Sequence, residues 1–430
     1  MNFTQQVRNQ LTNKLSNQFI RNISWLGVSE IIIRLSRLAT TVVLARFLSP
    51  KDYGLAAVVI TIHEFFFVFT RYGVNAKLIQ ANQAEIKDLS NSTFWFNWII
   101  FYSLFFLQCL AAFPLAIVFH DSQIILPLCL MAASYLILPL GTIQAGLIAR
   151  DNRLKITALV NIIQLSLGNF LTIILAILGL GMWSIVLPRL FLAPIWVLLY
   201  RRNHPWRATG KFTTEGWGEI FNFSKHILGT ELLKNFRNNL DYLIVGRFLG
   251  IEALGIYYFA FNAGLGISMS IISAINSSFF PYICAVKDHF SAFKHRYFSS
   301  LKFIAILMVS WVLLQSFLAP YYVPIIFGQK WVNAIPVLIL ICLSAIPRPF
   351  EDAASQLLIA VGKPNLVLRW NLLFTLILAG GIILGINEQL PGVAAAVLLT
   401  HVLFLPLFSV WATNYIFGSH SKYQAAFHKS

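Results

Sequence analysis

Charged side chains recur inside long apolar runs of this sequence, where a charge is costly. An Arg, Lys or Asp at the centre of a membrane-spanning helix costs about 2.5–3.5 kcal/mol, even on a lenient insertion scale. Most of these side chains must therefore pair with each other or face water inside a helix bundle. The basic ones are Arg34, Arg37, Arg46, Arg189, Lys225, Lys234, Arg237, Arg247, Arg348 and Arg369. The acidic ones are Glu30, Glu64, Glu231, Asp241, Glu351 and Asp352.

Helical geometry gathers many of these charges into two polar stripes. A residue turns by about 100° around the axis of an α-helix, so each stripe covers an arc of roughly 60–80°. The stripe on the first predicted span consists of Glu30, Arg34, Arg37 and Thr41. The stripe on the seventh predicted span consists of His226, Thr230, Lys234, Arg237 and Asp241.

The two stripes predict a water-accessible cavity that carries more positive than negative charge. Guanidinium groups bind the oxygens of phosphate and carboxylate in a bidentate geometry, so a diphosphate is a natural ligand. Arg189 joins this set because it follows Pro188 inside the sixth predicted span, where an interrupted helix would free backbone groups. The expected substrate-binding residues are Arg34, Arg37, Arg189, Lys234 and Arg237.

Other titratable residues on or beside the stripes have two roles that the sequence leaves open. They bind a coupling ion such as Na⁺ or H⁺, or they form intramembrane pairs that only orient helices, as Glu30 with Arg34 and Lys234 with Asp241. The residues concerned are Glu30, Glu231, Asp241 and His226.

The composition explains why these charges need special positions. The chain has 430 residues, of which 58% are hydrophobic and 11% are charged, whereas a soluble domain carries about 25% charged residues. This composition excludes a water-soluble enzyme and indicates an integral membrane protein. The four cysteines form no zinc or redox spacing. No GxxxxGK[ST] sequence is present, and we expect no cofactor and no metal.

Twelve apolar runs are long enough to span a bilayer as helices, which need about 20 residues each. Lys and Arg crowd the even-numbered connections and both tails, whereas the odd-numbered connections hold only Lys51 and Lys330. This bias predicts cytoplasmic termini and accounts for the net charge of +16 without nucleic acid. The predicted spans are 23–47, 54–70, 94–119, 124–148, 156–178, 182–200, 221–249, 254–283, 301–327, 332–360, 366–386 and 391–417.

The sequence is internally duplicated, which divides it into two sets of six predicted spans. The segment from Ser29 matches the segment from Thr230 at a constant offset of 201, at which Gly54 meets Gly255. Parallel repeats of this kind are typical of transporters, with the ligand site between the halves. The expected parts are an amphipathic cytoplasmic segment 1–22, an N-lobe 23–200, a basic linker 201–217, a C-lobe 218–417 and a cytoplasmic tail 418–430.

Several stretches resemble a known family. Residues 221–261, FNFSKHILGTELLKNFRNNLDYLIVGRFLGIEALGIYYFAF, are similar to the signature stretch of Wzx-like polysaccharide flippases of the MOP superfamily, in the colanic and teichuronic acid exporter group. Shorter stretches that fit the same family, in order along the chain, are ARFLSPKDYGLAAV, LSNSTFWFNW, IARDNRLKITAL, GLGMWSIV and FGQKWVNAIPVL.

The resemblance implies a fold and an activity. The fold is two six-helix lobes in a V shape around a central cavity. The activity is alternating-access movement of an undecaprenyl-diphosphate-linked oligosaccharide across the bacterial plasma membrane, with membrane lipids and enzymes of the same pathway as partners. In the family, basic residues on the first and seventh helices hold the diphosphate. This chain departs from equal halves, because Asn235 and Asn238 stand where the first half has Arg34 and Arg37.

Two other functions compete with this interpretation. A drug or cation antiporter of the same superfamily would have a more acidic or aromatic cavity than the basic one predicted here. A membrane glycosyltransferase or polymerase would carry a large loop on the outer face, whereas the odd-numbered connections predicted here are short.

Overall fold

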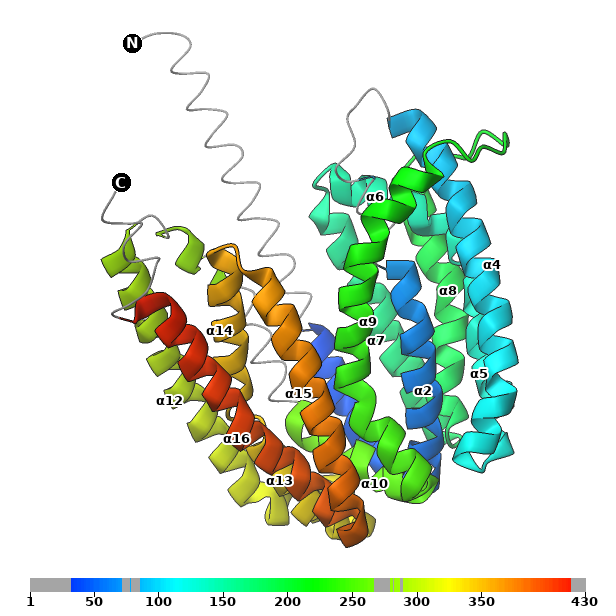
Figure 1. The fold of residues 1–430 in the computed structure, drawn as a ribbon. Helices are drawn as coiled ribbons and strands as arrows, with labels where there is room; N and C mark the ends of the chain where they lie inside the picture. Colours follow the sequence, from blue (N-terminus) through cyan, green and yellow to red (C-terminus); the bar gives the residue numbers. More distant parts are fainter. Residues whose placement is uncertain are drawn as a thin grey trace. The chain divides into compact units, whose positions relative to one another are not determined.

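The computed structural model describes residues 32–71, 78, 86–266, 279–280, 282–286 and 289–418. Every regular element in these ranges is a helix (Figure 1), which confirms the all-α prediction. The expected amphipathic segment 1–22, Glu30, the side chain of His226 and nearly all of the tail 418–430 lie outside the described residues.

Seven helical stretches of the described chain are long and apolar enough to cross a membrane. A further pair of helices, α5 and α6, passes the same test jointly and would make an eighth span, although the pair is bent by 58°. One of the seven stretches, Pro364–Phe417, contains two helices in succession, α15 and α16. The chain is therefore a multi-pass helical membrane protein.

The chain packs as two compact units. The first takes in residues up to Leu48 together with Val59–Asn235, and the second takes in Ser49–Val58 together with the chain from Phe236 onward. Ser49 and the first nine residues of the helix Pro50–Arg71 therefore pack with the second unit, although the sequence on both sides of them belongs to the first.

The first unit is a bundle around a buried core. Phe101, Tyr135 and Ala193 from three different helices meet in this core. Its elements are a helix over residues 32–47, the rest of α2 (Pro50–Arg71), α4 (Ile86–Phe119), α5 (Ile125–Ala132), α6 (Pro139–Arg150), α7 (Leu154–Ile177), α8 (Trp183–Asn203) and the first part of α9 (Trp217–Phe248).

Proline has different effects in two of these helices. Pro139 begins α6 after a short 3₁₀ turn, because proline fits the first turn of a helix but lacks the N–H that would continue α5. In α8, however, Pro188 and Pro194 lie within one continuous helix. The expectation of an interrupted helix at Pro188 is therefore wrong. Membrane helices tolerate proline where their surroundings satisfy the freed backbone groups.

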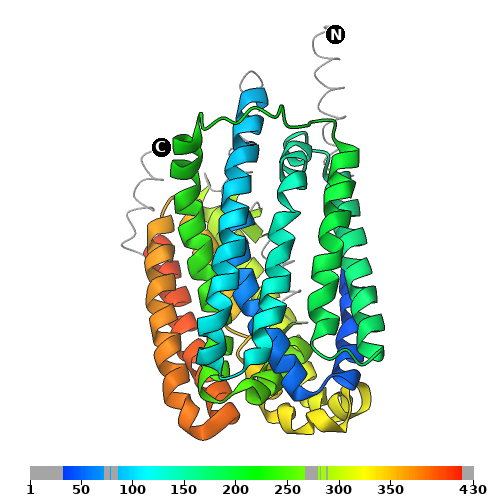
Figure 2. The ribbon, with the colours of Figure 1, turned by 90° about the vertical axis from the view of Figure 1, so that its right-hand side faces the viewer.

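The linker between α8 and α9, residues 204–216, runs across the end of α4 and is bound to the first unit (Figure 2). We call this linker the strap. Side chains of α4 bind its backbone: the Asn91 and Trp95 side-chain N–H groups each donate to the Lys211 carbonyl at 2.8 Å. The Trp217 indole donates to the Ser92 carbonyl at 3.2 Å, and the Gln144 amide donates to the Trp206 carbonyl at 3.1 Å. The basic linker is thus a fixed element.

The second unit has its own core, in which Phe293, Leu357 and Phe408 come from three helices. After the end of α9, its elements are α10 (Ile251–Ala260), a π-helical turn Phe261–Leu265, α12 (Phe290–Tyr322), α13 (Ile335–Leu343), α14 (Arg348–Ala360), α15 (Pro364–Gly385) and α16 (Gln389–Phe417).

The internal duplication is visible in matching turns. The turn after α6 has Asn152 at a φ of 55°, and the turn after α14 has Gly362 at a φ of 75°. In both turns an N–H bonds back to the carbonyl five residues earlier, Arg153 to Ile148 and Lys363 to Leu358. These are the left-handed helix ends of a Schellman motif, and they lie at an offset of 210.

Candidate functional site

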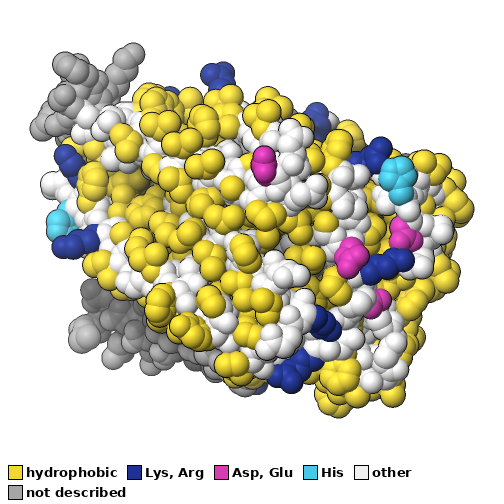
Figure 3. Space-filling model, turned by 90° about the horizontal axis from the view of Figure 1, so that it is seen from below, with side chains coloured by type: hydrophobic (Ala, Val, Ile, Leu, Met, Phe, Trp, Pro, Cys, Tyr) yellow, Lys and Arg dark blue, Asp and Glu magenta, His cyan; other side chains and the backbone are white. Residues whose placement is uncertain are grey.

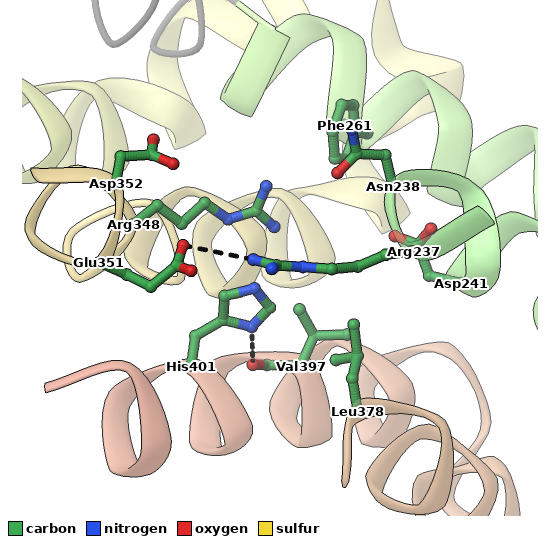
Figure 4. Close-up of a pocket in the computed structure, with 10 residues that line it drawn as sticks. All are labelled: Arg237, Asn238, Asp241, Phe261, Arg348, Glu351, Asp352, Leu378, Val397 and His401. Atoms are coloured by element: carbon green, nitrogen blue, oxygen red, sulfur yellow. Dashed lines mark hydrogen bonds and ion pairs between the residues drawn. The ribbon is translucent and has the colours of Figure 1, made fainter. Parts of the chain in front are cut away.

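A cluster of charged residues lies buried inside the second unit, around a cavity of about 90 Å³. Figure 4 shows side chains from α9, α14 and α16 converging on this cavity. The charges are two arginines and three carboxylates, with one histidine beside them. The lining residues are Arg237, Asn238, Asp241, Phe261, Arg348, Glu351, Asp352, Leu378, Val397 and His401.

Helix α14 supplies three of these five charges because of its spacing. Arg348, Glu351 and Asp352 stand at positions i, i+3 and i+4, which share one face of a helix. After the turn between α13 and α14, this face points toward α9 and α16, where it meets the other cavity residues (Figure 4).

Arg237 is held on several sides within the second unit. Its Nη2 lies 3.4 Å from Glu351 Oε2, and its Nη1 donates to Asn371 Oδ1. Its guanidinium carbon lies 4.8 Å from the centre of the Phe374 ring, a cation–π distance. Glu351 is only 5% exposed at its side chain. This predicted substrate-binding residue therefore belongs to an internal network.

Asp241 is buried and accepts two hydrogen bonds, neither of them from Lys234. Its Oδ2 accepts a hydrogen bond from the Tyr257 hydroxyl at 2.9 Å, and its Oδ1 accepts one from the Tyr242 N–H at 3.0 Å. Lys234 is exposed instead. Among the described residues, the alternative pair Lys234–Asp241 does not form.

His401 completes the cluster from α16. It is 3% exposed, and its Nδ1 lies 2.7 Å from the Val397 carbonyl oxygen, to which it donates. Its other nitrogen faces the cavity (Figure 4). A neutral imidazole held in this way presents an acceptor to the two arginines.

The helix over residues 32–47 presents its predicted stripe away from its packed face. Ser36 and Thr40 bind Asn169 of α7, through an amide-to-hydroxyl bond of 2.7 Å and a hydroxyl-to-carbonyl bond of 3.4 Å. Arg34 and Arg37 lie roughly 60–160° around the helix from these anchors. Arg34 is half-buried and Arg37 is exposed.

The remaining predicted residues lie in the first unit too. Arg189 is exposed and forms an ion pair with Glu64 of α2, with 3.0 Å between Nη1 and Oε1. The charge of Arg189 is therefore balanced. Lys234 is exposed on α9, and Glu231, one turn earlier, is half-buried.

Sequence reasoning missed Arg348, Glu351, Asp352 and His401 as site residues. The spacing of the three α14 charges was a usable signal, because it places them on one face of an otherwise apolar run. No local pattern around His401 marks it, since its neighbours come from helices that are distant in the sequence.

The profile of the family described as "Polysaccharide biosynthesis protein" matches residues 43–336, more than half of the chain. The chain belongs to this family. Curated relatives of it include the teichuronic acid biosynthesis protein TuaB of Bacillus subtilis, 22% identical, with 83% of this chain and 74% of that protein covered. The succinoglycan biosynthesis transport protein ExoT of Rhizobium meliloti is 25% identical, with 85% and 74% covered. The lipopolysaccharide biosynthesis protein WzxC of Escherichia coli is 22% identical, with 86% and 76% covered.

Solved structures show the same fold. An inward-facing multidrug resistance MATE family transporter of the MOP superfamily has a TM-score of 0.72 at 14% identity, with 95% of this chain and 99% of that chain covered. The lipid II flippase MurJ has a TM-score of 0.70 at 14% identity, with 90% and 87% covered. The family match confirms the resemblance to polysaccharide biosynthesis proteins, and the two solved structures share the fold.

Proposed function

We propose that this member of the polysaccharide biosynthesis family is a flippase. It moves an oligosaccharide linked to undecaprenyl diphosphate across the plasma membrane by alternating access. Twelve membrane-spanning helices in two six-helix lobes enclose the central cavity that receives the substrate. The names of WzxC, ExoT and TuaB support this direction, because each belongs to the biosynthesis of a bacterial polysaccharide.

The observation that carries the proposal is a pair of exposed cations on the predicted stripes. Arg37 and Lys234 are both exposed, on two different helices that belong to the first unit over these residues. Neither side chain forms an ion pair within the described part of the chain. On helices that we propose to span the membrane, exposed cations need water or an anion beside them, and a diphosphate supplies that anion. Arg34 assists them from the same face as Arg37, whereas Arg189 and Arg237 hold helices together.

The membrane potential favours this direction of transport. Moving negative charge outward across an inside-negative membrane is favourable by about 2.3 kcal/mol per charge at 100 mV. The buried cluster around Asp241 and Glu351 then resets the carrier by binding Na⁺ or H⁺. Glu30, Glu231 and His226 contribute on the stripes.

The orientation follows from the distribution of basic residues. Both termini lie in the cytoplasm, and the substrate is accepted from enzymes of the same biosynthetic pathway. Seen from the end at which α10 begins, hydrophobic side chains predominate on the surface, with scattered charged side chains among them (Figure 3). No chemical step on the substrate is part of this activity, which is transport.

The test is a flipping assay on the full chain in liposomes with a defined undecaprenyl-diphosphate-linked oligosaccharide. Arg37→Ala and Lys234→Ala should each slow flipping about tenfold or more, because each removes a charge-assisted contact worth about 1.5–3 kcal/mol. Arg37→Lys should retain part of the rate. The control is Arg202→Ala, an exposed cation of the linker region that lies off both stripes.

Wild-type rates in both alanine variants would contradict the proposed grip on the diphosphate. Export of a cationic dye with no flipping of the lipid-linked substrate would favour a drug antiporter. Elongation of the oligosaccharide during the assay would favour a polymerase.

A further inference from the structure

A second hollow of the second unit is a groove of about 570 Å³ between α12, α14 and α16. Helix α14 packs against both α12 and α16 (Figure 1), and its residues form the floor of the groove. Phe298 of α12 and Val402 and Val410 of α16 line the walls, and all three side chains are exposed. Close-packed protein interiors leave few voids larger than a water molecule. An opening of this size in a membrane protein has room for part of a lipid.

The lining of the groove changes from apolar to polar along α16. Val402 and Pro406 lie toward one end, whereas Ser409, Thr413 and Asn414 lie toward the other. A helix rises by 1.5 Å per residue, so the distance along α16 from Val402 to Asn414 is about 18 Å. One leaflet supplies half of a hydrocarbon core that is about 30 Å thick. The groove therefore has roughly the depth and the polarity of one lipid leaflet.

Two lysines of α12 flank the polar end of the groove. Phe298 lies at this end, because the hydroxyl of its neighbour Tyr297 is 3.2 Å from the hydroxyl of Thr413. Lys294 and Lys302 lie one turn before and one turn after Phe298, each within about 40° of it around the helix. Both lysines are exposed, and neither forms an ion pair with another described residue. Lysine binds phosphate as a point charge, so this end suits a phosphate group.

We propose that this groove binds an anionic phospholipid, with one acyl chain between α12 and α16 and the phosphate at Lys294 and Lys302. Asn414 lies near the C-terminal end of α16, so with the proposed cytoplasmic C-terminus the lipid belongs to the cytoplasmic leaflet. The anionic lipids of that leaflet attract lysines close to the membrane surface. The site is complete within the second unit, whereas the proposed diphosphate grip at Arg37 and Lys234 belongs to the first. This separation favours a resident lipid over the transported one.

The test measures bound lipid by native mass spectrometry. The full chain, purified in detergent, is mixed with equal amounts of phosphatidylglycerol and phosphatidylcholine that carry the same acyl chains. The wild type should retain phosphatidylglycerol in excess. Lys294→Gln should lower the ratio of the two retained lipids about fivefold, because one lysine beside an anionic lipid surface contributes about 1 kcal/mol. The control is Lys363→Gln, which removes an exposed lysine of the same unit that does not line the groove.

A second pair of variants tests the groove itself. Val402→Trp fills its apolar end and should lower the amount of retained phosphatidylglycerol about fivefold. Leu403→Trp adds the same side chain one residue further along α16, at a position that does not line the groove, and should leave retention unchanged. Val402 and Leu403 are both exposed, so neither substitution disturbs the core of the unit.

Equal retention of the two lipids by the wild type would overturn the proposal. So would an unchanged ratio in Lys294→Gln or unchanged retention in Val402→Trp, because either result would indicate ordinary boundary lipid. If Val402→Trp does not fold, the exposed substitution Lys294→Gln decides the matter. Undecaprenyl phosphate that displaces phosphatidylglycerol at equal concentration would assign the groove to the transported lipid instead. No flipping is measured, so a failed flipping assay would remove the proposed function and leave this site standing.

Discussion

At the scale of single residues, Arg237 shows which contacts residue type and spacing can predict and which they cannot. Its position on α9 puts it on the predicted stripe with Asp241, and both line the same cavity. Its partners Glu351 and Asn371 come from α14 and α15, more than a hundred residues away. No local sequence pattern predicts such partners, because they depend on how helices that are distant in the sequence pack.

The Arg237–Glu351 pair should contribute strongly to stability. Glu351→Gln leaves the buried guanidinium without its counter-charge and should destabilise the protein by about 3 kcal/mol or more. The measurement is the thermal unfolding midpoint of the purified chain in detergent, which should fall.

A double-mutant cycle with Arg237→Gln supplies the control for that measurement. The double variant should lose less stability than the sum of the two single losses, because neither charge is then left alone. Strictly additive losses would show that the two side chains do not act as a pair.

At the scale of elements, the linker between α8 and α9 departs from the simple basic connection that its sequence suggests. Arg207 donates to the carbonyls of Arg201 and His204, which satisfies groups at the end of α8. The Trp206 N–H donates to His204 Nδ1 at 3.2 Å, and His204 Nε2 lies 4.0 Å from Asp151 Oδ2. The strap therefore depends on a neutral histidine.

The attachment of this strap should weaken in acid. Burial lowers the pKa of His204; Asp151 acts in the opposite direction, and the cations Arg153 and Arg207 lower the pKa further. A detached strap therefore binds more protons than an attached one, and attachment loses stability as the pH falls below about 6.5, the ordinary histidine pKa. Hydrogen–deuterium exchange of residues 206–212, corrected for intrinsic rates, should accelerate from pH 7 to pH 5.

His204→Asn is the matched variant for this effect. An asparagine oxygen can accept the Trp206 N–H bond in place of Nδ1 but cannot take up the proton. The variant should show no acceleration, and an equal acceleration in wild type and variant would exclude His204 as the cause.

At the scale of the whole molecule, the sequence predicted the class of protein because hydrophobicity and charge are sums over the chain. The apolar runs and the scarcity of charge led to an all-α membrane protein, which the long apolar helices confirm, and the family match places the chain among polysaccharide biosynthesis proteins. The bend between α5 and α6 and the unbroken α8 were not predictable in this way. Proline restricts the backbone, and packing decides whether a helix stops or continues.

The predicted topology of the whole chain can be checked directly. With both termini in the cytoplasm, green fluorescent protein fused after residue 430 should be fluorescent in bacteria, and alkaline phosphatase at the same place should be inactive. Positive charges on the even-numbered connections are the reason. Active phosphatase at the C-terminus would reverse the proposed orientation.

The assignment of Ser49–Val58 to the second unit bears on how the two repeats could have evolved. A gene that encoded only the first repeat would leave Ser49–Val58 without the unit on which it packs. A gene that encoded only the second repeat would leave the first part of α9 without its unit. In two copies of a half-length ancestor, each of these segments would pack on the other copy, and fusion would make the exchange permanent in both directions. Cutting the present chain at its linker should therefore give two halves that are stable only when they are made together.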